Sequence, residues 1–384
     1  MCSNKASSKF KQLRRSYGFD EVAIVPGDVT VNPDQTSTDF AIGDFNFKIP
    51  IVTSAMDGVI DVDFAIKFGK FGGMGVLNLD GVQARYDNPS ELLAEIAAAP
   101  NEEVTALMQK VYAEPIKENL VGERVEAIKK AGVTCAISLI PANTKRFAPI
   151  VAEAGGDILV VQSTVTSARH VSKSYKGLVF SEMCKQISMP IVVGNCVSYT
   201  ACLELMQTGI AGVFVGVGPG AACTSREVLG VGVPQITATI DCAAARDEYY
   251  RETGRYVPII TDGGFHKGGD ICKAIVAGAD AVMLGSILAQ AEEAPGRGYH
   301  WGMSHPHPAL PRGTRIKVGT TGTLEQILFG PTSVTHGNQN LVGALRTAMG
   351  FCGAATVKEM HQAEMVIAPA ITTEGKSWQM MQGV

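Results

Sequence analysis

The sequence lacks any apolar run long enough to span a bilayer, since none reaches about 18 residues. It also lacks the apolar core of a signal peptide, because its first residues, Met1–Lys5, are largely polar. Basic charge is not in excess: 33 lysines and arginines face 37 aspartates and glutamates, and the formal net charge is −4. Nucleic acid is therefore a poor candidate partner. We expect a soluble cytoplasmic protein with no membrane contact.

Zinc-type cysteine spacing is absent as well. The nine cysteines form no CxxC pair and no Cys/His cluster, and their odd number argues against a full disulfide framework. In a reducing compartment most of them are expected to pack as small buried hydrophobes; these are Cys135, Cys196, Cys202, Cys242 and Cys272. Cys223 differs from them because its neighbours are turn residues.

Eight apolar runs, spaced by helical patterns, dominate the chain. They are Pro50–Met56, Gly73–Leu79, Thr134–Leu139, Ile158–Ser163, Pro190–Asn195, Gly212–Val217, Pro258–Gly263 and Ala281–Ser286. Continuous apolar runs indicate parallel strands that are covered on both faces. Helical patterns such as Glu123–Ala131 and Gly268–Ala277 alternate with them. The sequence therefore predicts an α/β protein, a (β/α)₈ TIM barrel in one domain spanning residues 1–384.

Other segments frame this barrel. Residues 1–49 form a preamble with two possible short strands, Asp20–Val25 and Phe40–Ile42. Residues 80–133 carry helical patterns and show no sign of an inserted domain. Two helical patterns, Asn340–Met349 and Val357–Ala363, precede a C-terminal tail over 366–384.

The stretch from 292 to 335 is expected to be irregular. It follows the last strand and is rich in Gly, Pro, His and Thr. A long segment of this kind beside a barrel mouth favours a mobile flap over the site. The alternative is a surface loop or a subunit contact.

Small or polar residues end almost every strand. They are Ser54–Asp57, Asn78, Gln162–Thr164, Gly194–Asn195, Gly216–Cys223, Asp262–Gly264 and Gly285–Ser286. In a barrel all of these lie on the C-terminal rim, where active sites of this fold are built. We therefore expect them to converge on one site.

The glycine-rich loop that ends in Cys223 carries the clearest chemical signal. A strand that passes into such a turn directs backbone N–H and C=O groups outward, and a thiol there is a candidate nucleophile if a nearby positive potential favours the thiolate. The carbonyls of Gly218 and Gly220 suit a hard cation. The alternative is a tight turn with an inert cysteine.

Two further features favour phosphate binding. Asp262-Gly-Gly264 leads toward Lys267-Gly-Gly269, and Gly285-Ser286 opens a helix. Glycine amides after the seventh and eighth strands, with a helix N-terminus, form the usual phosphate cradle of this fold. The Asp262 carboxylate suits ribose hydroxyls. Each motif alone is also an ordinary turn, but together on adjacent strands they favour a nucleotide.

Four stretches resemble the IMP dehydrogenase/GMP reductase family: Gly218–Arg226, Asp262–Gly264, Val282–Ser286 and Leu341–Thr356. The similarity runs from about Phe19 to about Met365. The chain is most similar to the short dehydrogenase branch, which lacks the paired regulatory (CBS) module that the family often inserts after the second barrel unit.

The resemblance implies oxidation of IMP to XMP, the committed step of GMP and guanine nucleotide biosynthesis. Cys223 would attack C2 of the purine, hydride would pass to NAD⁺, and water would hydrolyse the covalent thioimidate. Ser225 takes the family's threonine position, which helps to activate water or the leaving group. The residues implied for IMP are Ser54, Met56, Asn195, Asp262, Gly264, Gly285, Ser286, Tyr299, His300, Gly302 and Met303.

The resemblance also implies a cofactor site, a cation and an assembly. NAD would lie against Gln162, Ser163, Thr164, Gly216 and Gly218. A K⁺ ion would be held by Gly218, Gly220 and Cys223, with Glu374 and Gly375 of a neighbouring subunit. The family relationship implies a homotetramer.

The sequence departs from the family pattern at several positions. Ala221 replaces a serine, and Gln162 replaces an aspartate that commonly contacts the cofactor ribose. The family's Tyr-Arg-Gly-Met-Gly-Ser becomes Tyr299–Ser304, which leaves open whether Tyr299 or His300 reaches the phosphate. No Arg-Tyr pair is evident, so Arg312 is the candidate water-activating base, against the alternative of a solvated arginine.

Two other functions stay open. A GMP reductase would use NADPH, the same cysteine, and ammonia as leaving group; the missing Arg-Tyr pair favours it, whereas Arg226–Gln235 and Leu341–Thr356 are similar to the dehydrogenases. A non-catalytic nucleotide-binding regulator is the third possibility, although a pure binder would not need Cys223. No feature calls for a flavin.

Overall fold

Eight parallel strands form the centre of the computed structural model, which describes residues 12–171, 177–302 and 315–369. The sheet order is β4-β11-β10-β9-β8-β7-β6-β5. A parallel bridge between Val52 and Met74 joins the two outer strands and closes the barrel. The predicted (β/α)₈ barrel is confirmed. Its strands are β4 (Ile51–Thr53), β5 (Val76–Asn78), β6 (Ala136–Leu139), β7 (Ile158–Gln162), β8 (Ile191–Cys196), β9 (Gly212–Val215), β10 (Ile259–Asp262) and β11 (Ala281–Leu284).

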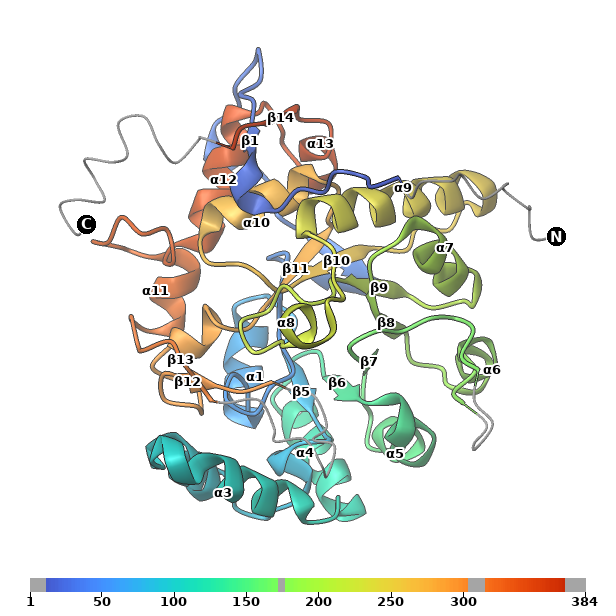
Figure 1. Ribbon diagram of the computed structural model, residues 1–384, viewed down its shortest axis with the longest axis vertical. Helices are drawn as coiled ribbons and strands as arrows, with labels where there is room; N and C mark the ends of the chain where they lie inside the picture. Colours follow the sequence, from blue (N-terminus) through green and yellow to red (C-terminus); the bar gives the residue numbers. More distant parts are fainter. Residues whose placement is uncertain (1–11, 172–176, 303–314, 370–384) are drawn as a thin grey trace.

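Helices surround this sheet, as Figure 1 shows. They are α1 (Val62–Lys70), α4 (Glu118–Lys130), α5 (Pro141–Glu153), α6 (Phe180–Gln186), α7 (Tyr199–Gln207), α9 (Gln235–Thr253), α10 (Gly268–Val276) and α12 (Leu341–Phe351). Side-chain caps fix where some of them begin: Asp61 accepts the Phe64 N–H for α1, and Ser198 accepts the Ala201 N–H for α7. Among the described helices, none combines the length and hydrophobicity needed to cross a membrane.

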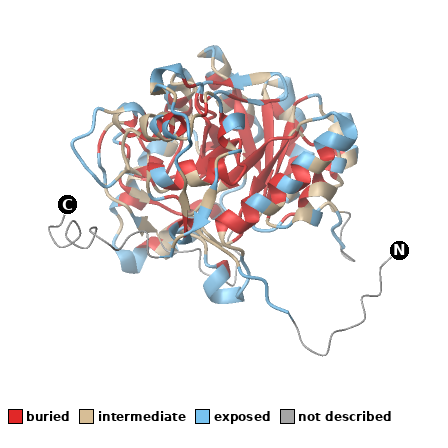
Figure 2. Cartoon of the chain, turned by 90° about the horizontal axis from the view of Figure 1, so that it is seen from above, coloured by how far each residue is buried: buried red, intermediate tan, exposed pale blue. Residues whose placement is uncertain are grey.

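Buried residues lie along the barrel strands and on the helices packed against them (Figure 2). The interior cluster contains Val160, Phe214 and Met283. It also includes Phe40 and Phe47 of a hairpin made of β2 (Phe40–Ile42) and β3 (Phe45–Phe47), which contact residues at the strand starts. The hairpin therefore closes the N-terminal end of the barrel, and the opposite end is left for the site.

The preamble and the chain's last described strand pair with each other. β1 (Val22–Ile24) runs antiparallel to β14 (Met365–Ile367). The two expected preamble strands thus correspond to β1 and β2. Two further helices are short: α8 (Ser225–Leu229), which begins just after Cys223, and α13 (Val357–Met360).

Between β5 and β6 the chain forms a helical pair outside the ring, α2 (Pro89–Ala98) and α3 (Asn101–Ala113), preceded by a short 3₁₀ turn, Val82–Ala84. Leu93, Met108 and Val111 pack in a separate apolar cluster there. This cluster also contains Trp301, from the segment that follows the last barrel strand.

The segment 292–335, expected to be irregular, contains three short regular elements in its described parts. β12 (Tyr299–His300) and β13 (Ile316–Lys317) form an antiparallel pair, and α11 (Leu324–Phe329) is capped by Thr323. These elements are only two to six residues long, so they leave no measurable periodicity in the sequence. Arg312 and Met303 lie outside the described residues.

Candidate active site

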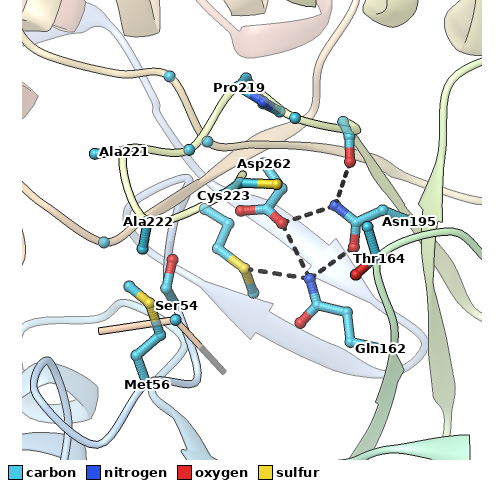
Figure 3. Close-up of a pocket in the computed structure, with 18 of the residues that line it drawn as sticks. Ser54, Met56, Gln162, Thr164, Asn195, Pro219, Ala221, Ala222, Cys223 and Asp262 are labelled. Carbon is cyan, nitrogen blue, oxygen red and sulfur yellow. Dashed lines mark hydrogen bonds between the residues drawn. The ribbon is translucent and has the colours of Figure 1, made fainter. Parts of the chain in front are cut away.

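A cavity of about 470 Å³ opens at the C-terminal end of the barrel (Figure 3). It is lined by sixteen of the residues singled out in the sequence: Ser54, Met56, Gln162, Ser163, Thr164, Asn195, Gly216, Gly218, Gly220, Cys223, Asp262, Gly264, Gly285, Ser286, His300 and Gly302. Ser225 is not part of this lining, but its hydroxyl is hydrogen-bonded to the Cys223 sulfur. Glu374 and Gly375 are outside the described residues, as are Arg312 and Met303.

The loop after β9 places a cysteine in this cavity. Gly216 begins the loop with φ 148°, and a Cβ there would lie 2.4 Å from the Asp262 carbonyl oxygen, so only glycine fits. The loop then turns, and the Cys223 N–H donates to the Gly220 carbonyl over 2.9 Å. The Cys223 thiol donates to the Ser225 hydroxyl over 3.3 Å. Cys223 is only partly buried, and its sulfur can therefore meet a ligand.

Asp262, at the end of β10, is held by two amides. Asn195 Nδ2 donates to Asp262 Oδ2 over 2.8 Å, and Gln162 Nε2 donates to the same oxygen over 3.1 Å. Burial raises the pKa of Asp262 to about 6, and these hydrogen bonds limit the shift. The carboxylate is thus charged near neutral pH, which suits it to accept hydrogen bonds from a diol.

The side-chain amide of Gln162 is part of this hydrogen-bond network. Besides Asp262, its Nε2 donates to Asn195 Oδ1 over 2.9 Å, while its Oε1 has no partner among the described residues. The amide nitrogen therefore holds Asn195 and Asp262 in place at the floor of the cavity, and the amide oxygen is buried.

On the other side of the cavity, Ser286 and His300 form a hydrogen-bonded pair. The Ser286 hydroxyl and His300 Nε2 are 2.9 Å apart, and His300 Nδ1 has no partner among the described residues. Burial lowers the pKa of His300 to about 4, so its imidazole is neutral at pH 7. Tyr299 is not part of the lining; its ring lies 4.1 Å from the Arg315 guanidinium. Between the two residues that the sequence left open, His300 is the one facing the cavity.

Several lining residues had no recognisable signal in the sequence. Ile140 and Pro141 follow β6, Phe265 follows β10, and Met283 lies in β11. These residues form apolar parts of the cavity wall. In the sequence, an apolar residue at the end of a strand cannot be distinguished from a residue of the hydrophobic core. Gln235 was also missed as a brace: its Nε2 donates to the Asp262 carbonyl over 2.7 Å and to the Val215 carbonyl over 3.3 Å.

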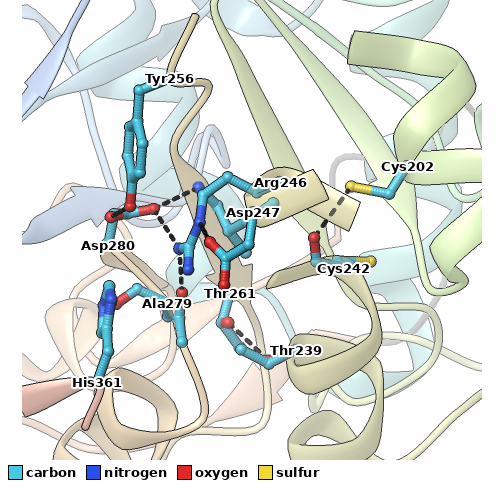
Figure 4. A network of polar contacts seen from close by, with 12 residues as sticks. Cys202, Thr239, Cys242, Arg246, Asp247, Tyr256, Thr261, Ala279, Asp280 and His361 are labelled. Atoms are coloured by element: carbon cyan, nitrogen blue, oxygen red, sulfur yellow. Dashed lines mark hydrogen bonds and ion pairs between the residues drawn. The ribbon is translucent and has the colours of Figure 1, made fainter. Parts of the chain in front are cut away.

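A second cluster of reactive side chains lies away from the cavity. Within the described ranges, one group of His, Cys, Asp or Glu side chains has ligand atoms close enough for a metal: Cys196, Cys202 and Cys242, within 4.8 Å of one another. All three are buried, and Cys202 Sγ donates to the Cys242 carbonyl over 3.7 Å (Figure 4). Cys242 Sγ donates to the Ser198 carbonyl over 3.9 Å. We interpret them as core thiols, two of which donate to backbone carbonyls.

Comparisons with known proteins agree with this picture. The profile of the "IMP dehydrogenase / GMP reductase domain" matches residues 16–304. An uncharacterized oxidoreductase of Mycolicibacterium smegmatis is 39% identical over 366 residues, covering 93% of this chain and 98% of the relative. The inosine-5'-monophosphate dehydrogenase of Cryptosporidium parvum is 28% identical over 402 residues, covering 95% and 94%. The crystal structure of an IMP dehydrogenase/GMP reductase-like protein from Corynebacterium glutamicum has a TM-score of 0.88 at 36% identity, covering 93% of this chain and 96% of that one.

Proposed function

This chain belongs to the IMP dehydrogenase/GMP reductase family, and from that membership we propose that it is an NAD-dependent IMP dehydrogenase. One observation carries the proposal: a single cavity collects a partly buried thiol, a carboxylate and a hydroxyl from the ends of β9, β10 and β11, and an imidazole from β12 that bonds to the hydroxyl. These groups suit the base, the ribose and the phosphate of a nucleotide in turn.

In the proposed reaction the Cys223 sulfur bonds to C2 of the purine and hydride leaves C2. Bound NAD⁺ supplies the hydride acceptor. Water then adds at C2 of the covalent thioimidate, the C–S bond breaks, and XMP leaves while the thiol is restored. IMP, NAD⁺ and water thus give XMP, NADH and a proton.

The remaining residues of the chain orient these steps. Ser225 accepts the thiol hydrogen bond and fixes the direction of the Cys223 sulfur. Asp262, held by Asn195 and Gln162, accepts from the ribose hydroxyls. The Ser286 hydroxyl accepts from the Nε2–H of neutral His300 and donates to the phosphate, together with backbone amides of Gly264 and Gly285. Arg312 stays the predicted water-activating residue.

The groups available for NAD are neutral. Thr164 is exposed at the mouth of the cavity, and the Ser163 hydroxyl is already paired with Thr166 over 2.8 Å. These hydroxyls and the backbone of Gly216 and Gly218 can hydrogen-bond a ribose or a carboxamide. They therefore fit the ribose and the carboxamide of a nicotinamide nucleotide.

Potassium and a homotetramer belong to the same proposal. Gly218, Gly220 and Cys223 offer backbone carbonyls on one loop, and the Gly220 oxygen keeps a lone pair after accepting from Cys223. Carbonyl oxygens are the ligands that such a cation prefers. Val228, Leu229 and Val231 are exposed just beyond this loop, at 72%, 67% and 48%, and a subunit contact would cover them.

The deciding experiment incubates the purified protein with IMP and NAD⁺ in potassium buffer and measures NADH and XMP. In parallel, GMP and NADPH are tested for IMP and ammonia. Formation of XMP supports the proposal, whereas consumption of NADPH with GMP would make the protein a GMP reductase. Nucleotide binding without either reaction, and without a covalent adduct on Cys223, would indicate a regulator.

A further inference from the structure

The hydroxyl of Tyr112, on α3, connects two segments that wall the cavity. It donates to Asp57 Oδ2 over 2.5 Å and accepts from Trp301 Nε1 over 2.6 Å. Asp57 follows Met56, and Trp301 follows His300, so each partner is one residue from the cavity lining. Tyr112 is 5% exposed and Trp301 1%, and solvent therefore does not substitute for these bonds.

A second attachment lies on the other strand of the β12–β13 hairpin. Arg315, next to β13, donates to the carbonyls of Ile96 and Ala97 over 2.5 Å and to that of Ala99 over 2.8 Å. These carbonyls belong to the end of α2, where helical partners are lacking. The hairpin is thus fixed to the α2–α3 pair from both of its strands, and Figure 1 shows α3 on that side of the barrel.

The two walls also touch each other directly. A Cβ on Gly58 would lie 2.9 Å from both His300 Cα and the Tyr299 carbonyl oxygen. The Gly296 N–H donates to the Gly58 carbonyl over 3.0 Å. With no space between the segments, a shift of the hairpin is passed on to His300 and to its bond with Ser286.

We propose that Tyr112 is a positioning residue: through its hydroxyl the α2–α3 pair holds Met56 and His300 in the geometry that binds the nucleotide. The proposal rests on the proposed function, because it takes the nucleotide to be the ligand of His300 and Ser286. Tyr112 itself does not line the cavity and does not touch the reacting atoms.

The test compares Tyr112→Phe with Tyr86→Phe. The Tyr86 hydroxyl donates to the Val111 carbonyl on the same helix over 2.9 Å, so this control loses a similar hydrogen bond that does not reach the cavity. We expect Tyr112→Phe to raise KM for IMP about tenfold with kcat changed less than twofold, while Tyr86→Phe changes neither. Arg315→Gln, which removes the second attachment, should act in the same direction as Tyr112→Phe.

A ligand-free measurement keeps the two proposals apart. Hydrogen exchange of residues 296–302 should be faster in Tyr112→Phe than in wild type and Tyr86→Phe. Unchanged exchange, or faster exchange with wild-type KM for IMP, would overturn the inference. If wild type neither binds nor turns over IMP but exchange is faster, the hairpin role stands and the assigned nucleotide is wrong. In a double-mutant cycle with Trp301→Phe, the effects on KM should be less than additive, because both changes break the hydrogen bond between Trp301 and Tyr112.

Discussion

Asn195 donates both of its amide hydrogens at the floor of the cavity, one to Asp262 Oδ2 over 2.8 Å and one to the Gly216 carbonyl over 2.8 Å. A single side chain therefore ties the end of β10 to the start of the Cys223 loop. The geometry has an energetic cost, because it places a carboxylate where burial raises its pKa to about 6.

Asp262→Asn is predicted to stabilise the protein near pH 7. A raised pKa means that the folded state binds the Asp262 proton more tightly than the unfolded chain, whose value is 3.8. The favourable contribution is full below about pH 4 and is lost as the pH rises through about 6. Asparagine has no charge to bury, so the free energy of unfolding near pH 7 should rise by at most about 3 kcal/mol. The asparagine oxygen can still accept from Asn195 and Gln162.

Thermal unfolding measured between about pH 4 and pH 7 checks this prediction. The melting temperature of Asp262→Asn should exceed that of wild type near pH 7, and the difference should shrink toward pH 4. Asp28→Asn, at an exposed position, is the control and should show no such trend. The same Asp262 variant should lose most of its affinity for IMP, since it lacks the ribose acceptor. A pH-independent difference would contradict the assignment of the raised pKa.

Cys223→Ser is predicted to abolish turnover, by at least about a thousandfold, while IMP still binds. Serine keeps the size of the side chain and the bond to Ser225, but its hydroxyl is a far weaker nucleophile toward C2. Calorimetric binding of IMP and mass spectrometry for a covalent adduct measure the two effects separately. Cys184→Ser, a partly buried cysteine outside the cavity lining, should behave as wild type. Near-normal turnover in Cys223→Ser would remove the proposed mechanism.

Ser286→Ala is predicted to weaken IMP binding about tenfold and inosine binding hardly at all. The hydroxyl that Ser286 shares with His300 faces the place proposed for the phosphate, which inosine lacks. A lost hydrogen bond to a charged group corresponds to about 1.5–3 kcal/mol. Binding of both ligands to wild type and variant gives the comparison. Equal losses for IMP and inosine would place the phosphate elsewhere.

The sequence was a good guide to the barrel and to the rim, for one physical reason. Strands that are buried on both faces are continuous apolar runs, so strands such as Ile158–Gln162 and Ile191–Cys196 were visible, and their polar ends had to meet at one edge. Nothing local marks the bonds of Tyr112, because its partners Asp57 and Trp301 are 55 and 189 residues away. In the sequence, a tyrosine on the apolar face of an amphipathic helix cannot be distinguished from an ordinary core residue.

The orientation of the Gln162 side-chain amide could not be predicted from the sequence either. Its position at the end of a strand predicted a place at the site, but only the fold shows that it turns toward Asn195 and Asp262. Between Tyr299 and His300, strand alternation decides which side chain faces the cavity, and a strand of two residues is too short to predict that alternation.

Arg246→Met is predicted to destabilise the protein without changing its site. Arg246 is 3% exposed and donates to the Gly278 carbonyl over 2.6 Å and to Asp280 Oδ2 over 3.0 Å, just before β11, at the end of the barrel away from the cavity (Figure 4). Tyr256 donates to the other oxygen of Asp280 over 2.5 Å. Removing the guanidinium leaves a buried carboxylate without its cation, which costs about 3–5 kcal/mol.

Urea unfolding measures this cost, and KM for IMP well below the transition should stay at the wild-type value because the cavity lies at the opposite strand ends. Arg14→Met is the matched control: Arg14 pairs with Asp241 over 2.5 Å, but it is exposed, and the transition midpoint should barely move. Replacing Arg246 and Asp280 together with Met and Leu should recover part of the loss, since no charge is then left buried. If Arg246→Met unfolds at the same urea concentration as wild type, the hydrogen bonds and the ion pair around Asp280 do not stabilise the fold.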